Sequence, residues 1–134
     1  MISEGKKRAL LYVCGENVEE QKQKAYKYAE ELCYQITDVI IAKDDGDWNK
    51  VPGFIVTTHK IDGPPIEAVF IDRLMILPSD DCSVINVFKF LEDYRVCLIV
   101  DGYKFDMNDY NESVPIQLGF AFCTFQKRIG KRLF

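Results

Sequence analysis

Four short runs of apolar residues, each followed by a segment of helical character, constrain the fold of this 134-residue chain more than any other feature. The runs are rich in valine, isoleucine and leucine, and they lie at 9–13, 38–42, 68–71 and 96–100. Runs this short and this apolar are typical of parallel strands that are covered on both faces. The sequence therefore predicts an α/β fold with a mostly parallel sheet of four to five strands and helices on both faces.

Two of the helices are predicted by their start signals. Asn17, with Glu20 three residues later, resembles a capping box, and apolar residues then recur at helical spacing through Cys33. Pro52 and Gly53 lead into a second, shorter helix. The polar segment 43–49, which precedes that helix, is expected to form a loop.

The other two helices follow the third and fourth apolar runs. Ser79 or Asp80 is expected to cap the third helix. The fourth is expected to run from about Val114 to the C-terminus, after a polar and aromatic loop at 101–113. Apolar spacing predicts the inner side of the third helix, which holds Val84, Ile85, Phe88 and Leu91.

The length suits a single domain, residues 1–134, and we expect no helix-turn-helix DNA-binding domain within this chain. A net charge of −4 excludes a uniformly basic nucleic-acid binder. The last eight residues nevertheless hold four cations and no acid. They could touch DNA phosphate weakly and in a salt-sensitive manner. These candidate DNA contacts are Lys127, Arg128, Lys131 and Arg132.

The five cysteines are widely spaced and form no Cys-x-x-Cys pair. We expect reduced, buried thiols and a cytoplasmic location. No metal site is expected, because His59 is the only histidine and no ligand cluster surrounds it. No cofactor is expected either, since no glycine-rich phosphate-binding motif is present. The longest apolar run has six residues, whereas a membrane span needs about 20, so no membrane segment is expected.

Polar residues follow each apolar run, where ligands bind in open parallel sheets. The segments to inspect are therefore 14–17, 43–49, 72–78 and 101–110. Three of them carry motifs in a familiar order. The first strand ends in Tyr12-Val13-Cys14 and is followed by Gln21, Asp45-Gly46 is followed by Val51-Pro52-Gly53, and the third strand ends in Asp72-Arg73-Leu74.

This order of motifs resembles the N-terminal catalytic domain of the serine recombinases, the resolvases and invertases. Their first strand ends in Tyr-x-Arg-x-Ser and is followed by Gln, an Asp-x-Gly loop precedes Arg-Pro-Gly, and the third strand ends in Asp-Arg-Leu-x-Arg. The resemblance runs from about Arg8 to the C-terminus. It implies a resolvase-like fold with the layering of flavodoxins, and a role in site-specific DNA recombination.

The resemblance also implies a mechanism that this chain lacks the residues to perform. In the family, a serine hydroxyl attacks a DNA phosphate and several arginines neutralise the transition state. Here Asp72, Arg73 and Gln21 remain as remnants of that site. The other positions have changed: the serine position falls at Glu16 or Asn17, and arginine positions fall at Cys14, Val51 and Ile76. The resemblance therefore implies a degenerate active site, with no confident catalytic residue.

The last helix carries two apolar stripes. Ile116, Phe120 and Cys123 form one stripe, which can face the sheet. The other stripe needs a partner, and in the resembling family the helix at this place forms the dimer interface. The candidate dimer residues are Leu118, Phe122, Phe125 and Ile129.

These observations predict a recombinase-like domain that does not cleave DNA itself. It would act as a homodimer, or as a heterodimer with an active recombinase, and bind DNA weakly. One alternative is an active recombinase with a shifted nucleophile, either Cys14 or a distant serine. Another alternative is a small flavodoxin-like or receiver-like signalling domain. A receiver domain needs acidic residues after its first strand and an aspartate at the end of its third strand, and Glu16 and Asp72 match these positions only weakly.

Overall fold

A computed structural model describes residues 5–60 and 63–133, with side chains described as far as Ile129. The elements follow one another as β1 (Lys7–Cys14), α1 (Val18–Glu31), β2 (Tyr34–Ala42), the 3-10 helix η1 (Asp45–Lys50), α2 (Val51–Lys60), β3 (Ile66–Ile71), the 3-10 turn η2 (Leu74–Ile76), α3 (Asp81–Asp93), β4 (Cys97–Val100), β5 (Tyr103–Phe105) and α4 (Tyr110–Leu133). This alternation confirms the predicted α/β class.

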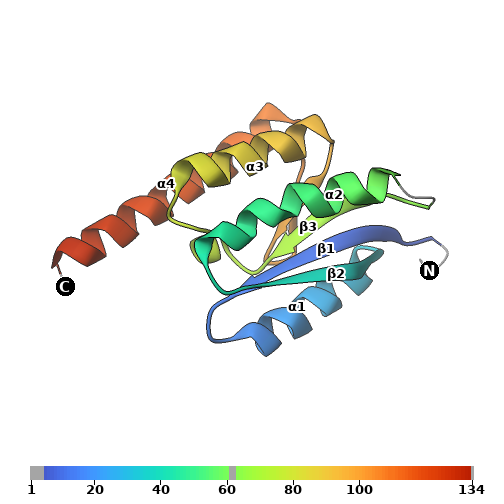
Figure 1. Ribbon diagram of the computed structural model, residues 1–134, viewed down its shortest axis with the longest axis horizontal. Coiled ribbons are helices and arrows are strands. Elements are labelled where there is room, and N and C mark those ends of the chain that lie inside the picture. The colour runs from blue at the N-terminus through green and yellow to red at the C-terminus, as the bar shows by residue number, and fades with distance from the viewer. Residues whose placement is uncertain (1–4, 61–62, 134) are drawn as a thin grey trace.

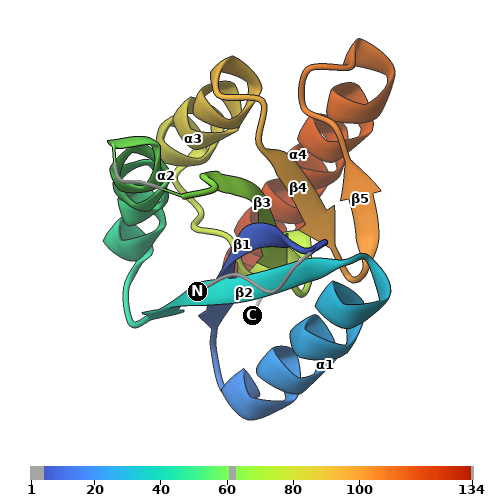
Figure 2. The same cartoon turned by 90° about the vertical axis from the view of Figure 1, so that its right-hand side faces the viewer.

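The strands form one sheet in the order β2-β1-β3-β4-β5 (Figure 2). The first four strands are parallel and β5 is antiparallel to β4. The expected loop at 101–113 therefore contains a strand that the sequence analysis missed. Asp101 and Gly102 both have positive φ, and they join β4 to β5 as a two-residue hairpin turn. An Asp-Gly pair is the sequence signal for such a turn.

The helices cover both faces of the sheet, as predicted (Figure 1). Helix α1 covers one face, where the alanines Ala25 and Ala29 pack against Leu11 and Val13 of β1. Helices α2 and α3 cover the other face (Figure 1). The small side chains of α1 let that helix lie close to the strands, whereas the second face holds the larger core.

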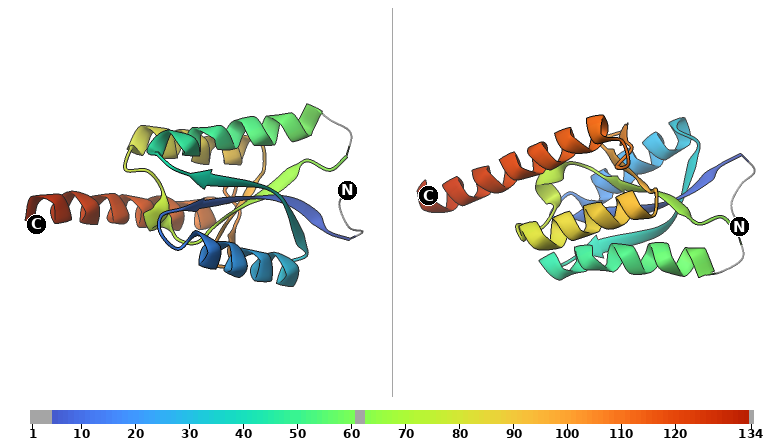
Figure 3. Two further views of the ribbon diagram at one scale, coloured as in Figure 1. Left: turned by 60° about the horizontal axis from the view of Figure 1, so that its bottom comes forward. Right: turned by 90° about the horizontal axis from the view of Figure 1, so that it is seen from above.

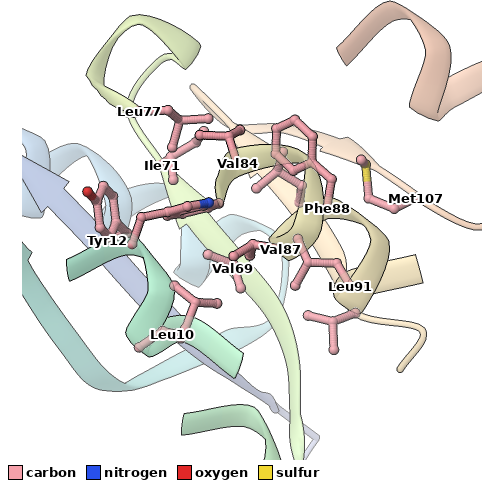
Figure 4. Close-up of a cluster of buried hydrophobic side chains, with 14 of the residues drawn as sticks. Leu10, Tyr12, Val69, Ile71, Leu77, Val84, Val87, Phe88, Leu91 and Met107 are labelled. Atoms are coloured by element: carbon pink, nitrogen blue, oxygen red, sulfur yellow. The ribbon is translucent and has the colours of Figure 1, made fainter. Parts of the chain in front are cut away.

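The larger core is organised by aromatic side chains that join four elements. Tyr12 of β1 meets Trp48 of η1 edge-on at 4.9 Å between ring centroids, and Trp48 meets Phe88 of α3 at 6.4 Å. Phe88 in turn meets Phe120 of α4 at 6.1 Å. Figure 4 shows Tyr12 of β1, Val69 of β3 and Phe88 of α3 in this one cluster. The chain of rings fixes η1 and α4 relative to the sheet.

Several local predictions at the helix ends are corrected by the structure. Asn17 makes no side-chain cap hydrogen bond, because its φ of −99° and ψ of 44° differ from the extended conformation that a capping residue adopts. Cys33 is exposed, because α1 ends before it and the chain reverses there with a φ of 62°. Asp80 does cap α3 and accepts hydrogen bonds from the N–H groups of Cys82 and Ser83.

Three further predictions differ from the structure. Ile85 is 41% exposed, because its neighbours Val84, Val87 and Phe88 form the inner face of α3 instead. Segment 43–49 is largely helical, since Asp44 and Asp47 form a capping box that starts η1. None of the five cysteines is buried: Cys33 and Cys82 are exposed, and the others are half-buried.

Helix α4 begins at Tyr110, four residues before the predicted start. The Asp109 carboxylate accepts a hydrogen bond from the N–H of Asn111, and its backbone carbonyl accepts one from Ser113. The helix is 24 residues long, and its C-terminal half projects beyond the sheet (Figures 1 and 3). The first half therefore belongs to the core, while much of the second half lies outside it.

Candidate functional site

A cleft of about 320 Å³ lies at the carboxyl ends of the strands, where the sequence analysis placed the site. It is lined by residues from the end of β1, the turn that follows, α1, η1, the segment from β3 to α3, and α4. Its polar and reactive lining side chains include Cys14, Glu16, Asp45, Arg73, Ser79 and Lys127. Residues distant in sequence thus meet at one edge of the sheet.

The end of β1 is fixed by Gln21, one of the predicted remnant residues. Its amide nitrogen donates to the carbonyl oxygen of Cys14 at 2.7 Å, and its amide oxygen accepts from the N–H of Cys14 at 3.2 Å. Gln21 is only 6% exposed. The resemblance marked Gln21 only as a remnant of the family's site, and the structure gives it a positioning role. The available signal was a glutamine on the stripe of α1 that includes Ala25 and Ala29.

The thiol of Cys14 is poorly suited to nucleophilic attack. Burial is the largest cause that raises its pKa, and the negative charge of Asp45 raises it further. The ammonium of Lys127 lowers the pKa of Cys14 but does not reverse the effect. The thiolate is the reactive form of cysteine, so a raised pKa leaves the thiol protonated at neutral pH.

Asp72 and Arg73, the other two remnant residues, lie beside the same cleft. Arg73 Nε is 3.7 Å from Asp72 Oδ2, and Lys24 Nζ is 3.8 Å from Asp72 Oδ1. A second hollow of about 180 Å³, next to the cleft, is lined by Asp72, Arg73, Lys24 and Gln21. Arg73 lines both hollows and its side chain is 65% exposed, so its guanidinium can reach a ligand in either one.

The positions that the resemblance predicts to be replaced lie in two different places. Cys14, Glu16, Asn17 and Ile76 all line the cleft. Val51, the remaining arginine position, is fully buried in the core at the start of α2.

The predicted DNA contacts of α4 are partly engaged within the chain. Lys127 Nζ donates to the carbonyl oxygen of Leu77 at 2.9 Å, and Arg128 lies 3.4 Å from Asp81 Oδ2. The first contact joins α4 to the segment between β3 and α3, and the second joins α4 to the first residue of α3. The side chains of Lys131 and Arg132 lie outside the described residues.

The second apolar stripe of α4 faces away from the sheet. Leu118 is 66% exposed, Phe122 60%, Phe125 58% and Ile129 36%. The first stripe is inward, with Ile116 and Phe120 buried. The predicted division of the helix into two stripes is therefore correct, and four large apolar side chains remain in solvent in this single chain.

The cleft is lined by both positively and negatively charged side chains. Arg73 and Lys127 could attract an anion, whereas Glu16 and Asp45 would repel it.

Among residues 5–60 and 63–129, no group of three or more His, Cys, Asp or Glu side chains could hold a metal ion. Across the described helices, none combines the length and the apolar character that crossing a membrane requires.

Comparison with known proteins gives a fold but no close relative. No protein-family model matches the sequence, and no curated protein matches it. The N-terminal catalytic domain of TP901-1 integrase superposes with a TM-score of 0.64 and 16% identity, covering 92% of this chain and 98% of that one. A resolvase family site-specific recombinase from Streptococcus pneumoniae superposes with a TM-score of 0.62 and 18% identity, covering 95% of this chain and 89% of that one.

These two structures identify the architecture. The chain has the fold of the serine recombinase catalytic domain over nearly its whole length, as its strand-end motifs predicted. At 16% and 18% identity the likeness concerns the fold and not the chemistry.

Proposed function

We propose that this protein is a recombinase-type domain that does not cleave DNA and that acts by assembling with a second copy or with an active recombinase. The observation that carries the proposal is the set of side chains that line the cleft. The recombinase fold is kept, yet a carboxylate, Glu16, lines the cleft near the place where the resembling family has its nucleophilic serine.

The chemistry of strand cleavage supports this part of the proposal. A phosphoryl transfer of this kind needs a nucleophilic hydroxyl and cationic groups that stabilise the charge on the transferring phosphate. Glu16 cannot form the covalent phosphoseryl link and repels an approaching phosphate. Removing a single stabilising donor typically costs about 2.7–4 kcal/mol in the barrier, and three arginine positions are changed here.

The assembly part of the proposal rests on α4. Its outer stripe exposes Leu118, Phe122, Phe125 and Ile129 along a helix that projects beyond the sheet (Figure 3). A contiguous apolar face of this kind is typical of an interaction surface. The obvious partners are a second α4 or the same helix of an active recombinase.

DNA association is proposed to be weak and to depend on the basic end of α4. Lys127 already holds the carbonyl of Leu77, and Arg128 lies beside Asp81, so neither cation is fully available to phosphate. The remaining attraction is non-specific and falls as salt rises. The proposal places the protein in the cytoplasm, where its five free thiols stay reduced.

The cleavage part is tested by looking for a covalent protein–DNA adduct. The purified chain is incubated with end-labelled duplex DNA and with supercoiled plasmid, and the products are separated on denaturing gels. We expect no labelled protein band and no nicking, while an active serine recombinase on its own target DNA gives both. An adduct that Cys14→Ala or Ser79→Ala removes would contradict the proposal.

A second candidate function, an active recombinase with a shifted nucleophile, is favoured by one observation. Ser79 supplies a hydroxyl to the same cleft as Arg73 and Lys127. Cys14 is the weaker substitute because burial keeps its thiol protonated. The adduct experiment separates the two candidates directly, since only the second predicts a covalent product.

The DNA part is tested by fluorescence anisotropy of a labelled duplex across a salt series. We expect binding at low salt that weakens steeply with salt, and that Arg128→Gln with Arg132→Gln weakens further. The matched control removes two cations from α1, Lys22→Gln with Lys27→Gln. Equal loss in both double variants would show general charge attraction and contradict a role for the end of α4.

A further inference from the structure

A groove runs between β2 and α2 and is separate from the cleft. It comprises two neighbouring hollows of about 460 and 480 Å³, and Lys50 and Phe54 line both of them. Asp38, Gly53 and Thr57 line the first hollow, and residues 39–41 line the second. We call it the β2–α2 groove. None of the residues that line it also lines the cleft.

One wall of the groove is a strand at the edge of the sheet. β2 is the first strand in the sheet order and pairs with β1 along one side (Figure 2). On the other side, no strand of the described part of the chain lies beside its outward N–H and C=O groups. Such an edge is a template for a further strand.

The pairing of β2 with β1 divides this edge into two parts. The register shifts between Ala9 and Leu10, which leaves Thr37 as an extra residue in β2. Arg8 Nε donates to Thr37 Oγ1 at 2.8 Å and fixes this bulge. A bulge interrupts strand addition, so the usable edge is the regular segment from Asp38 to Ala42. The groove lies beside that same segment.

The space in the groove suits side chains that project from an added strand. Phe54 is half-buried and presents apolar surface to both hollows. A Cβ atom built on Gly53 would meet no atom within 4 Å, so the wall of α2 leaves room at this position. Ile41, on the edge strand, is 47% exposed. The groove therefore combines an edge strand with apolar walls.

The charges around the groove balance one another. Arg8 Nη2 lies 3.3 Å from Asp38 Oδ2, and Lys50 Nζ lies 2.7 Å from Asp47 Oδ1. The remaining charged lining residues, Lys43 and Asp44, are of opposite sign. A nucleic acid needs an excess of cations, which this groove does not have. An uncharged ligand matches it better.

We propose that the β2–α2 groove binds an extended, uncharged peptide of a partner protein, which adds to the sheet beside Asp38–Ala42 and places apolar side chains at alternate positions into the groove. Main-chain hydrogen bonds to β2 supply affinity in this mode of recognition, and the pockets select the side chains. A second copy is a poorer occupant, because α1 and α2 flank its own β2 edge (Figure 1). This proposal does not depend on the function proposed above.

The experiment starts from a displayed library of random 12-residue peptides, selected on the immobilised full chain. Selected peptides are synthesised with a fluorophore and their dissociation constants are measured by anisotropy. We expect apolar residues at alternate positions and an affinity that changes less than twofold between 50 and 500 mM NaCl. In a complex with the wild-type chain, amide hydrogen exchange should slow at Asp38–Ala42.

Two variants with a new tryptophan provide the control. Gly53→Trp fills the open space in the groove and should weaken peptide binding at least tenfold. Asn86→Trp, on the exposed side of α3, should leave binding within twofold of wild type. Far-UV circular dichroism and thermal unfolding verify that both variants fold.

Three outcomes would overturn the proposal. The first is that no peptide is enriched, and the second is that enriched peptides bind Gly53→Trp as tightly as wild type. The third is self-association of the wild type that Gly53→Trp abolishes, which would assign the groove to a second copy. None of these results changes the DNA adduct or anisotropy experiments, so the two proposals fail separately.

Discussion

Gln21 connects the first helix to the end of the first strand through two hydrogen bonds to the same residue. Its side chain hydrogen-bonds both backbone groups of Cys14, the last residue of β1. A buried backbone group that loses its partner costs about 1–3 kcal/mol. The shape of the cleft therefore depends on one amide side chain.

Replacement of this amide should destabilise the fold. We expect Gln21→Leu to lower the free energy of unfolding by about 1–3 kcal/mol, because the N–H and C=O of Cys14 lose their partner. Urea unfolding followed by circular dichroism measures the change. Gln23→Leu, an exposed position on the same helix, is the control and should lie within about 0.5 kcal/mol of wild type. Equal effects at both positions would contradict the positioning role.

Gly102 is required by its conformation and by a neighbouring ring. Its φ is +81°, and a Cβ atom there would lie 2.7 Å from ring carbons of Tyr28. We expect Gly102→Ala to destabilise the protein by about 1–3 kcal/mol. Gly53→Ala, in a helix with open space around it, should be neutral or stabilising by up to about 1 kcal/mol. Thermal unfolding compares them, and the opposite ranking would contradict this interpretation.

Among the elements, η1 shows how a segment expected to be a loop becomes ordered. The Asp47 carboxylate accepts hydrogen bonds from the N–H groups of Lys43 and Asp44 and pairs with Lys50 at 2.7 Å. These contacts place Trp48 in the core. The hydrogen bond from Lys50 is the largest cause that lowers the pKa of Asp47 to about 2.

This lowered pKa gives a predicted pH dependence. The folded pKa of Asp47 lies below the ordinary value of 3.8, so its stabilising contribution is present above that pH. It is lost as the pH falls from about 4 through about 2. We expect Asp47→Asn to flatten the dependence of the urea midpoint on pH within this range, with Asp45→Asn as the control. Unchanged acid sensitivity in Asp47→Asn would contradict the prediction.

Several elements could be predicted because their signals are local. The apolar runs specify the first four strands, and Asp80 specifies the start of α3 by accepting from its first N–H groups. The hairpin at Asp101 and Gly102 was missed although its signal is local too. Asn17 fails as a cap because its φ of −99° and ψ of 44° are not those of a capping residue, and residue type alone does not reveal this conformation.

For the whole molecule, the exposed stripe of α4 is the feature that a single chain leaves unexplained. We expect the wild type to sediment with twice the chain mass at micromolar concentration. Phe122→Asp with Phe125→Asp should give a folded monomer, because charges at these exposed positions oppose apolar contact. The control is Gln117→Glu with Gln126→Glu, which adds two charges on α4 outside the stripe.

Either of two results would contradict this prediction. A wild-type chain that remains monomeric at high micromolar concentration would show that the stripe does not mediate self-association. A dimer that survives both phenylalanine substitutions would place the interface elsewhere. A heterodimer with an active recombinase is then examined by the same method on the mixed proteins.

The sequence by itself determined the alternation of strands and helices, the two stripes of α4 and the resemblance at the strand ends. These follow from residue type and spacing, which act over a few neighbours. Only the tertiary structure decided which side chains share a space. Val51 is buried away from the cleft while Ser79 and Lys127 enter it, and the β2–α2 groove joins Arg8 of β1 to residues of β2, η1 and α2. Such contacts depend on how the helices pack on the sheet, and no local pattern encodes that packing.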